Sequence, residues 1–399
     1  MTALHTFEIL IGTYLSLCTL LLFVLSIAGV RSMRPARVKT RKKRKLLVLI
    51  PAYKEDSVIV ETAKKSLNQH YPEALYEVIV IADGLKNQTL EYLRYLPIHV
   101  FPVRFEKSTK VKALNMALDY FLDASFEGVV IIDADNIMHP NFLHYVNNAL
   151  DNGMMAIQGQ RMAKNKDSQF SFLDAVSEDV NNHIFCKGAN NLGLSSRLAG
   201  SGMAFLPELL KSLLGKSKAI GGFDKELELE IVSKNIKINY VEDAIVFDEK
   251  VSGSKAFYTQ RTRWIHAQYK YLYQQFVSGA IWKAMGKLNL DYLYKILVLV
   301  QPPRLLMPVS LMTLSMIYFM IQGMAGSTLL FIALTIINAI TFLLAIPTSY
   351  FTKDSWSQWL ALGNAFIQTI RALINLPSAG KSFLHTPHGS TLNDKNLNS

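Results

Sequence analysis

Residues 129–136 read VVIIDADN, an uncharged β-branched run followed at once by two aspartates and an asparagine. A short apolar run bounded by polar turn residues predicts a strand in the interior of a sheet. Two similar runs precede it, at Leu46–Ile50 and Glu77–Ile81, and helical patterns lie between the runs, at Ser57–His70 and Val111–Leu122. This alternation predicts an α/β domain with a mostly parallel, Rossmann-like sheet covered by helices.

Acidic residues follow each of these runs, at the strand ends where ligands of such sheets bind. PAYKE (51–55) follows the first run, Asp83 follows the second, and Asp133 and Asp135 follow the third. Asp83 alone is more simply a turn residue. In extended backbone, however, residues i and i+2 point the same way, so Asp133 and Asp135 can share one hard cation. Such a cation would bridge a diphosphate, and Mg²⁺ or Mn²⁺ suits it better than zinc.

Two further clusters lie later in the chain. Residues 224–230 read DKELELE, an alternation of acidic and apolar residues that could be only a solvated face. Residues 260–264 read QRTRW, and on a helix Gln260, Arg263 and Trp264 share one face. Guanidinium groups suit phosphate and an indole suits a sugar ring, but an amphipathic helix on a membrane surface would have the same composition.

Composition excludes several classes of protein. Half of the residues are hydrophobic and only 18% are charged, which is too apolar for a wholly soluble or disordered chain. Nine of the positive charges behind the net charge of +11 lie in residues 31–45, so no nucleic-acid partner is expected. Two cysteines exclude a disulfide framework. The chain has no GxGxxG or GxxxxGK[ST] motif, which removes support for dinucleotide and P-loop sites.

The N-terminal segment Ile9–Val30 has 22 residues without a charge, enough to cross a hydrocarbon core of about 30 Å. A cleaved signal peptide would have basic residues before the apolar run, whereas here Glu8 precedes it and the basic residues follow. We therefore expect an anchor. The positive-inside rule places the chain after Arg31 in the cytoplasm, attached to the plasma (inner) membrane.

The C-terminal third has a second apolar region. Leu305–Thr352 contains no charged side chain over 48 residues, which predicts two membrane helices joined by a turn at Gln322–Thr328. Trp356–Leu376 is apolar but carries Arg371, so it is either an interfacial helix or a span that lines a polar cavity.

With PAYKE, ADG, DAD and QRTRW in this order between apolar ends, the chain resembles the membrane-integrated family-2 glycosyltransferases of the QxxRW type. These include cellulose, hyaluronan, chitin and poly-N-acetylglucosamine synthases and ceramide glucosyltransferases. The resemblance implies a GT-A fold, a nucleotide-diphosphate sugar donor such as a UDP-sugar, Mg²⁺ or Mn²⁺, and inversion at the anomeric carbon. The expected organisation is an anchor at 1–30, a basic juxtamembrane segment at 31–45, a GT-A domain at 46–255, QxxRW and interface helices at 256–300, a transmembrane hairpin at 301–352 and an interfacial or transmembrane helix with a tail at 353–399.

The resemblance also assigns roles to individual residues. The expected donor-binding residues are Tyr53, Glu55, Asp83, Lys110, Asp133, Gln260 and Arg263. The expected acceptor-binding residues are Gly200, Ser201, Gly202 and Trp264. Asp133 and Asp135 would bind the metal, with Asp135 as the more direct ligand.

The chain departs from the family pattern at the general base. Family members usually have Thr-Glu-Asp before the Leu-Glu-Leu stretch, where the Asp is the base, and this chain has Asp224, Lys225 and Glu226. The resemblance therefore implies Glu226 as the base, with Asp224 in reserve. Ala267 replaces a glycine that is common in processive members, which weakens the expectation of processivity.

Three functions remain open. The leading expectation is synthesis of an extracellular β-linked polysaccharide. The alternative is transfer of a single sugar to a membrane lipid, such as a ceramide or a diacylglycerol. The small number of membrane segments favours either this alternative or an oligomer. A non-catalytic nucleotide-sugar sensor or export scaffold is the third possibility, although a sensor would not need a general base.

Overall fold

The computed structural model describes residues 3–33, 42–217 and 219–375. Four basic residues of the predicted juxtamembrane segment lie outside the described residues, namely Arg34, Arg37, Lys39 and Arg41. The C-terminal tail from residue 376 also lies outside them. Arg44, at the end of the basic segment, is tied to the domain by an ion pair with Asp151 at 2.6 Å.

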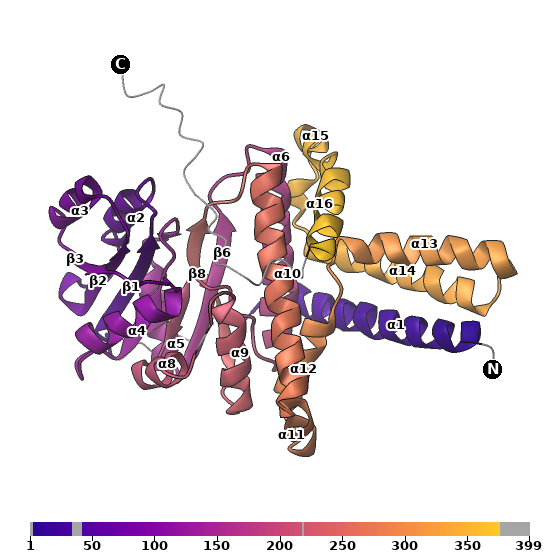
Figure 1. Ribbon diagram of the computed structural model, residues 1–399, viewed down its shortest axis with the longest axis horizontal. Helices are drawn as coiled ribbons and strands as arrows, with labels where there is room; N and C mark the ends of the chain where they lie inside the picture. Colours follow the sequence, from indigo (N-terminus) through magenta and orange to yellow (C-terminus); the bar gives the residue numbers. More distant parts are fainter. Residues whose placement is uncertain (1–2, 34–41, 218, 376–399) are drawn as a thin grey trace.

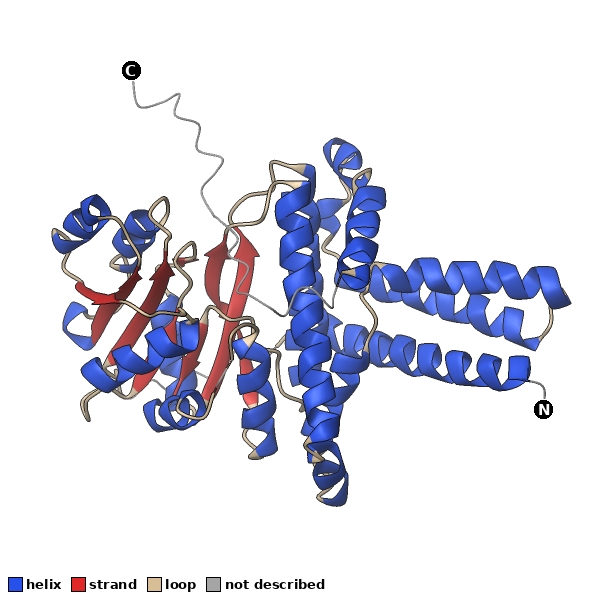
Figure 2. Ribbon diagram, in the orientation of Figure 1, coloured by secondary structure: helices blue, strands red, loops and turns tan. Residues whose placement is uncertain are grey.

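An eight-stranded mixed sheet, in the order β3-β2-β1-β4-β7-β6-β8-β5, forms the centre of the domain (Figure 2). The strands are β1 (Leu46–Tyr53), β2 (Tyr76–Asp83), β3 (His99–Val103), β4 (Gly128–Ile131), β5 (Ile137–Met138), β6 (Ala156–Ala163), β7 (Met203–Phe205) and β8 (Ile238–Asp248). β1, β2, β3 and β4 are parallel, β7 is antiparallel to β4 and β6, and β6 is parallel to β8. The predicted mostly parallel, GT-A-type sheet is confirmed.

Helices bury both faces of the sheet, which explains why its strands are apolar without alternation. Along β1, Leu47 and Leu49 face one side and Leu46, Val48 and Ile50 face the other. The first side is covered by α4 (Lys110–Phe121), α8 (Pro207–Leu214) and α9 (Phe223–Ser233). The second side is covered by α2 (Ile59–Ser66), α3 (Asn87–Arg94) and α5 (Phe142–Asp151).

A second group of helices lies between the sheet and the apolar end of the molecule (Figure 1). It consists of α6 (Gln169–Asn181), the π-helix η2 (Asn182–Gly188), α7 (Ala189–Asn191), α10 (Ser254–Val277), α11 (Ala280–Gly286) and α12 (Leu290–Val300). The QRTRW motif lies in α10, so the helical geometry expected for it is present.

Three apolar helices project side by side away from the sheet (Figure 1). They are α1 (Ala3–Val30), α13 (Leu306–Gln322) and α14 (Gly326–Ala345). Within α1 and α14, Glu8–Val30 and Gly326–Ala345 are long and apolar enough to cross a membrane, and α13 is shorter. The break between α13 and α14 falls inside the predicted turn at Gln322–Thr328.

The C-terminal half of α1 packs on η2. The ring Nε2 of His183 lies 2.8 Å from the carbonyl oxygen of Ser26. A Cβ atom on Gly188 would approach the carbonyl oxygen of Leu25 to 2.1 Å, so the two helices touch backbone to backbone there. The apolar bundle and the α/β domain therefore share a close-packed junction.

The C-terminal stretch that sequence left open between a span and an interfacial helix is broken into two helices. They are α15 (Trp356–Trp359) and α16 (Leu362–Ile374), which follow the short 3₁₀ turns Thr348–Tyr350 and Lys353–Ser355. With 13 residues, α16 is about 20 Å long, less than the roughly 30 Å of a hydrocarbon core. It packs along α10, as an interface helix would.

Candidate active site

One cavity of about 700 Å³ extends from the carboxyl ends of β1, β2 and β4 to the apolar helices. Eleven of the predicted site residues line it, namely Tyr53, Glu55, Asp83, Lys110, Asp133, Asp135, Gly200, Asp224, Gln260, Arg263 and Trp264. These residues come from segments that are more than two hundred positions apart in the chain. Ser201, Gly202 and Glu226 do not line it.

The sheet itself brings Tyr53 and Asp83 together. They are the last residues of β1 and β2 and are partners in the parallel register. The backbone N–H of Lys54 donates to the carbonyl oxygen of Asp83 at 3.0 Å and extends the pairing by one residue. These two residues, which the resemblance assigns to donor binding, thus lie at one edge of the sheet, as the alternation of strands and helices predicted.

Lys110 begins α4 and reaches the aspartates that follow β4. Its ammonium group donates to Asp133 Oδ1 and, at 2.8 Å, to the carbonyl oxygen of Gly200. The same ammonium lies 4.9 Å from the centre of the Phe223 ring. Lys110 therefore joins three segments of the cavity wall through one positive charge.

Ser201 and Gly202 do not line the cavity, although Ser201 contacts the backbone of Asp133. The Ser201 hydroxyl accepts from the backbone N–H of Asp133 at 2.9 Å and is fully buried. Gly202 has a φ of 64°, and a Cβ atom there would lie 2.7 Å from Val246 Cγ1. Direct acceptor contact, which the resemblance implied for both residues, does not fit these positions.

Asp135 is also held by its neighbours. With the Asn136 amide oxygen accepting from Ser201 Oγ at 2.7 Å, the amide nitrogen donates to Asp135 Oδ1 at 2.9 Å and to Asp248 Oδ1 at 3.0 Å. Among the described residues, no group of three or more His, Cys, Asp or Glu side chains could hold a metal. Two carboxylates suit a hard cation that takes its remaining oxygen ligands from a bound diphosphate.

Arg263, from α10, lies where the acidic groups of the cavity meet. Burial lowers the pKa of its guanidinium, and the carboxylates of Asp133, Asp224 and Asp135 partly offset this effect. The surrounding carboxylates therefore favour the protonated, charged form of the Arg263 guanidinium. A metal on the aspartates would leave the guanidinium available to a phosphate.

The structure reverses the order of the two base candidates. α9 begins at Phe223, so Asp224 and Glu226 lie about 200° apart around the helix. Asp224 lines the large cavity, whereas Glu226 lines a separate cavity of about 450 Å³ and accepts a hydrogen bond from the Ser217 hydroxyl. The preference for Glu226 rested on its alignment with the Asp of the family's Thr-Glu-Asp, and that alignment does not determine which face of the helix the residue occupies.

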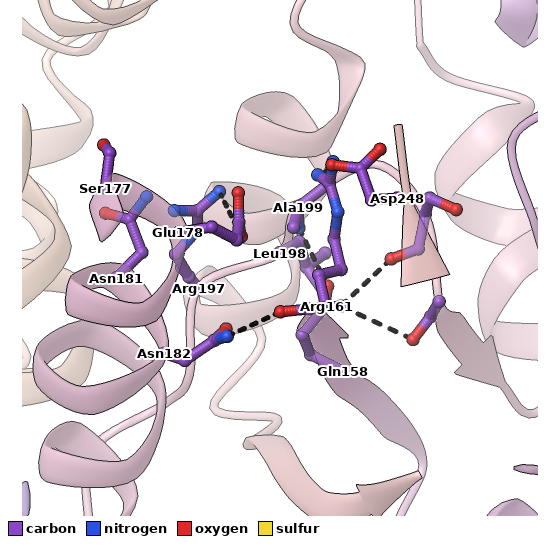
Figure 3. A network of polar contacts seen from close by, with 12 residues as sticks. Gln158, Arg161, Ser177, Glu178, Asn181, Asn182, Arg197, Leu198, Ala199 and Asp248 are labelled. Atoms are coloured by element: carbon purple, nitrogen blue, oxygen red, sulfur yellow. Dashed lines mark hydrogen bonds and ion pairs between the residues drawn. The ribbon is translucent and has the colours of Figure 1, made fainter. Parts of the chain in front are cut away.

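A buried network of ion pairs, which sequence reasoning missed, lies beside the cavity (Figure 3). Arg161, on β6, pairs with Asp248 at the end of β8 and donates to the carbonyl oxygen of Ala199 at 2.7 Å. Lys250 contacts Asp248 at 2.6 Å and Glu178 at 3.4 Å. No sequence motif marks these residues, because their partners come from distant elements.

The paired groups of this network stabilise one another's charged forms. Burial would raise the pKa of the Glu178 and Asp248 carboxyls, but the cations of Lys250 and Arg161 hold both pKa values below their ordinary values. The same two carboxylates raise the pKa of Lys250 against the effect of its burial. The network is therefore fully ionised at neutral pH and fixes the cavity wall.

Comparison with known proteins agrees with this geometry. Residues 43–267, more than half of the chain, match the family described as glycosyltransferase like family 2. The chain belongs to this family. The predicted enzyme class is thereby confirmed: the protein is a family-2 glycosyltransferase.

Two known proteins indicate how far the likeness of this glycosyltransferase extends. It is 22% identical over 245 residues to the probable glycosyltransferase YdaM of Bacillus subtilis (strain 168), and the match spans 57% of this chain and 56% of that protein. Its fold resembles that of the mannosyltransferase PcManGT from Pyrobaculum calidifontis, solved in complex with GDP-Man and Mn²⁺. That match has a TM-score of 0.60 and 18% identity, and covers 93% of this chain and 97% of the other.

A third similarity is more limited. Glucosyl-3-phosphoglycerate synthase from Mycobacterium tuberculosis, solved with Mn²⁺, UDP and phosphoglyceric acid, matches 53% of this glycosyltransferase and 71% of its own chain, with 20% identity and a TM-score of 0.36.

Proposed function

We propose that this glycosyltransferase is a membrane protein that moves one sugar from a nucleotide-diphosphate sugar to a hydroxyl group of a lipid acceptor, with inversion. The observation that carries the proposal is the single cavity that joins the aspartates Asp133 and Asp135 to the apolar helices. At the far end its lining includes Phe342 of α14 and Trp359 of α15. A lipid entering from the bundle would meet the donor without leaving the cavity.

The donor end is suited to a diphosphate. Asp133 and Asp135 would hold Mg²⁺ or Mn²⁺, which would neutralise the diphosphate and stabilise its charge as it leaves. Lys110, now paired with Asp133, would turn its ammonium toward the same phosphates. Arg263 would bind them with two parallel hydrogen bonds. The mannosyltransferase PcManGT, whose fold this chain resembles, was solved with GDP-Man and Mn²⁺, which supports a divalent metal at this position.

Asp224 is the general base in this mechanism. A hydroxyl is a poor nucleophile at neutral pH, so a carboxylate must accept its proton as the bond forms. The acceptor oxygen bonds to the anomeric carbon from the face opposite the diphosphate, the bond from that carbon to the diphosphate breaks, and the nucleotide leaves with the electron pair. Trp264 lines the same cavity and would pack against the sugar.

Transfer to a lipid is preferred here to polymer synthesis, the leading expectation from sequence. A polymer would need a path across the membrane, and α1, α13 and α14 bury their facing side chains, including Leu22, Leu311 and Phe331, against one another. The outer faces of the three helices expose apolar side chains, such as Leu10, Met316 and Ile336, as expected for contact with lipid. The basic segment after α1 supports a cytoplasmic catalytic domain.

One assay tests the proposal. Purified protein in lipid nanodiscs is incubated with Mn²⁺ and a panel of UDP- and GDP-sugars, and both organic extract and aqueous residue are analysed by mass. A lipid that gains a single hexose or related sugar is the expected product. A ladder of water-soluble oligomers would favour the polysaccharide synthase. Donor binding without nucleotide release in any lipid mixture would favour the sensor or scaffold.

A further inference from the structure

Three arginines that the transfer mechanism does not use converge on the middle of the cavity. Arg197 lies in the loop before β7, Arg261 lies on α10, and Arg304 lies just before α13, and all three line the cavity wall. Figure 3 shows Arg197 beside Glu178, Ser177 and Asn181 of α6. These arginines come from three different segments, so the fold brings like charges together in one cavity.

The acidic residues nearby do not neutralise this cluster. Arg261 pairs with Asp174 at 2.9 Å, and Arg197 lies 3.9 Å from Glu178, which is also shared with Lys250. Arg304 donates to the amide oxygen of Asn181 at 2.6 Å. Within the described part of the chain, no carboxylate lies within 4.0 Å of the Arg304 guanidinium. The cluster therefore carries excess positive charge.

Several donors of the cluster are also unused. The Nε atoms of Arg197 and Arg261 and the Nη1 atom of Arg304 are buried and have no hydrogen-bond partner among the residues that the structure describes. A buried donor without a partner costs free energy, more so when it is charged. Burial, followed by repulsion from Arg197 and Arg261, lowers the pKa of the Arg304 guanidinium. An anion between the three side chains would satisfy both the donors and the charge.

The cluster is separate from the position of the donor diphosphate. The three arginines contact α6, through Asp174, Glu178 and Asn181, whereas Lys110 contacts Asp133 after β4. Beyond the cluster the wall becomes apolar, with Leu305, Pro308, Phe342, Ile346 and Trp359. An anion on the arginines would thus lie between the reacting centre and an apolar chamber.

We propose that the Arg197–Arg261–Arg304 cluster binds the phosphate of an anionic lipid acceptor, whose apolar chains extend toward α14 and α15 and whose hydroxyl group reaches Asp224. This inference rests on the proposed transfer to a lipid and narrows the acceptor from neutral lipids to those with a phosphate between chain and hydroxyl. Guanidinium groups suit phosphate because their planar donors match its oxygens in pairs. The phosphate is bound and oriented but is not itself changed.

Binding of matched lipids tests the proposal without requiring turnover. Dioleoyl phosphatidic acid and dioleoylglycerol have the same chains and differ in the phosphate, and inorganic phosphate supplies the free ion. Brominated forms of the two lipids are titrated into the detergent-solubilised full chain, and quenching of Trp359 is measured, with Trp359→Phe to assign the signal. We expect the phosphatidic acid to bind about tenfold to hundredfold more tightly than the diacylglycerol.

Variants of Arg304 give the decisive comparison. Arg304→Gln should remove most of this preference and Arg304→Lys should keep part of it, while Arg94→Gln on the exposed face of α3 should change nothing. Binding of the nucleotide sugar with Mn²⁺, measured on the same samples, shows that each variant is folded.

Equal affinity for the two lipids, or a full preference in folded Arg304→Gln, would overturn the phosphate site. Competition by inorganic phosphate at equal concentration would overturn the lipid assignment. If phosphatidic acid binds selectively but no lipid ever receives sugar, the proposed function fails and the phosphate site stands.

Discussion

Asp224 and Glu226 stand two residues apart on α9, yet their carboxylates face different cavities. Asp224 lines the cavity that contains Asp133 and Arg263, and Glu226 accepts a hydrogen bond from Ser217 on the other side of the helix. A step of two residues turns the side chain about 200° around a helix axis. Of these two residues, only Asp224 lines the large cavity, so we propose Asp224 as the general base.

The general base is tested by two single substitutions. Asp224→Asn should lower kcat by about 10²–10⁴, because the hydroxyl keeps its proton, and should leave the affinity for the nucleotide sugar nearly unchanged. Glu226→Gln should retain most of the activity, since its carboxylate does not reach the cavity. Steady-state transfer and donor binding are measured for both. An inactive Glu226→Gln beside an active Asp224→Asn would restore the order implied by the family resemblance.

The two aspartates after β4 predict a dependence on metal. Asp135→Asn should abolish transfer and weaken Mn²⁺-dependent binding of the nucleotide sugar, because one hard carboxylate ligand is lost. Asp243→Asn, at an exposed position of β8, is the matched control and should behave as wild type. The readout is donor affinity by calorimetry with Mn²⁺, with Mg²⁺ and with excess chelator. Unchanged donor affinity in chelator would contradict the metal assignment.

The parts of the fold that sequence predicted are those with strong local patterns. β1, β2 and β4 are buried on both faces, so their apolar runs are visible without a partner. β6 and β8 escaped notice because their sequences, AIQGQRMA and INYVEDAIVFD, contain polar residues. Arg161 lies near the end of β6 and Asp248 ends β8, and their charges are tolerated because the fold pairs them.

The sequence predicted most of the residues that line the site, but it did not predict which way their side chains face. The carboxyl-edge rule located Asp83, Asp133 and Asp135, since parallel strands deliver their ends to one side. The rule does not say which side chains of α9 face the cavity, because that depends on the residue at which the helix begins. Arg197 and Arg304 lie in no motif, and Arg261 was noted only as part of QRTRW, because only the packing of α6, α10 and the apolar helices brings the three together.

The close packing of α1 on η2 predicts that one methyl group added at Gly188 lowers the stability of the protein. Gly188→Ala would place a Cβ atom 2.1 Å from the Leu25 carbonyl oxygen, so α1 must move and its packing is lost. We expect a loss of about 1–3 kcal/mol in the free energy of unfolding. Gly286→Ala, in a helix with no atom within 4 Å of the new Cβ atom, should be neutral or slightly stabilising. Equal melting temperatures for the two variants would show that α1 is not packed on η2.

Topology can be read with single cysteines, because the native Cys18 and Cys186 are both buried. Ser327→Cys, in the first turn of α14, should react with an impermeant maleimide added to intact cells. Ser57→Cys, on the exposed surface of the α/β domain, should react only after lysis. The reverse labelling pattern would place the catalytic domain outside the cell, where nucleotide sugars are scarce, and would contradict the cytoplasmic orientation.

The buried network predicts a specific dependence of stability on pH. Lys250 and Arg161 hold the pKa of Glu178 below its ordinary value despite burial, so this carboxylate takes up its proton more readily in the unfolded chain. Its contribution to stability is complete above the unfolded pKa of about 4.3 and declines as the pH falls toward the folded pKa. Glu178→Gln should cost about 3–5 kcal/mol at pH 7, because it leaves Lys250 with fewer partners.

The difference in melting temperature between wild type and Glu178→Gln should therefore be constant from pH 7 to 5 and should narrow below about pH 4, where the wild type loses this contribution. Glu91→Gln, at an exposed position of α3, should stay close to wild type at every pH. Thermal unfolding in detergent is recorded across this range for all three proteins. A difference that widens as the pH falls would mean that the folded pKa of Glu178 lies above its unfolded value, and that the cations around it do not hold its charge.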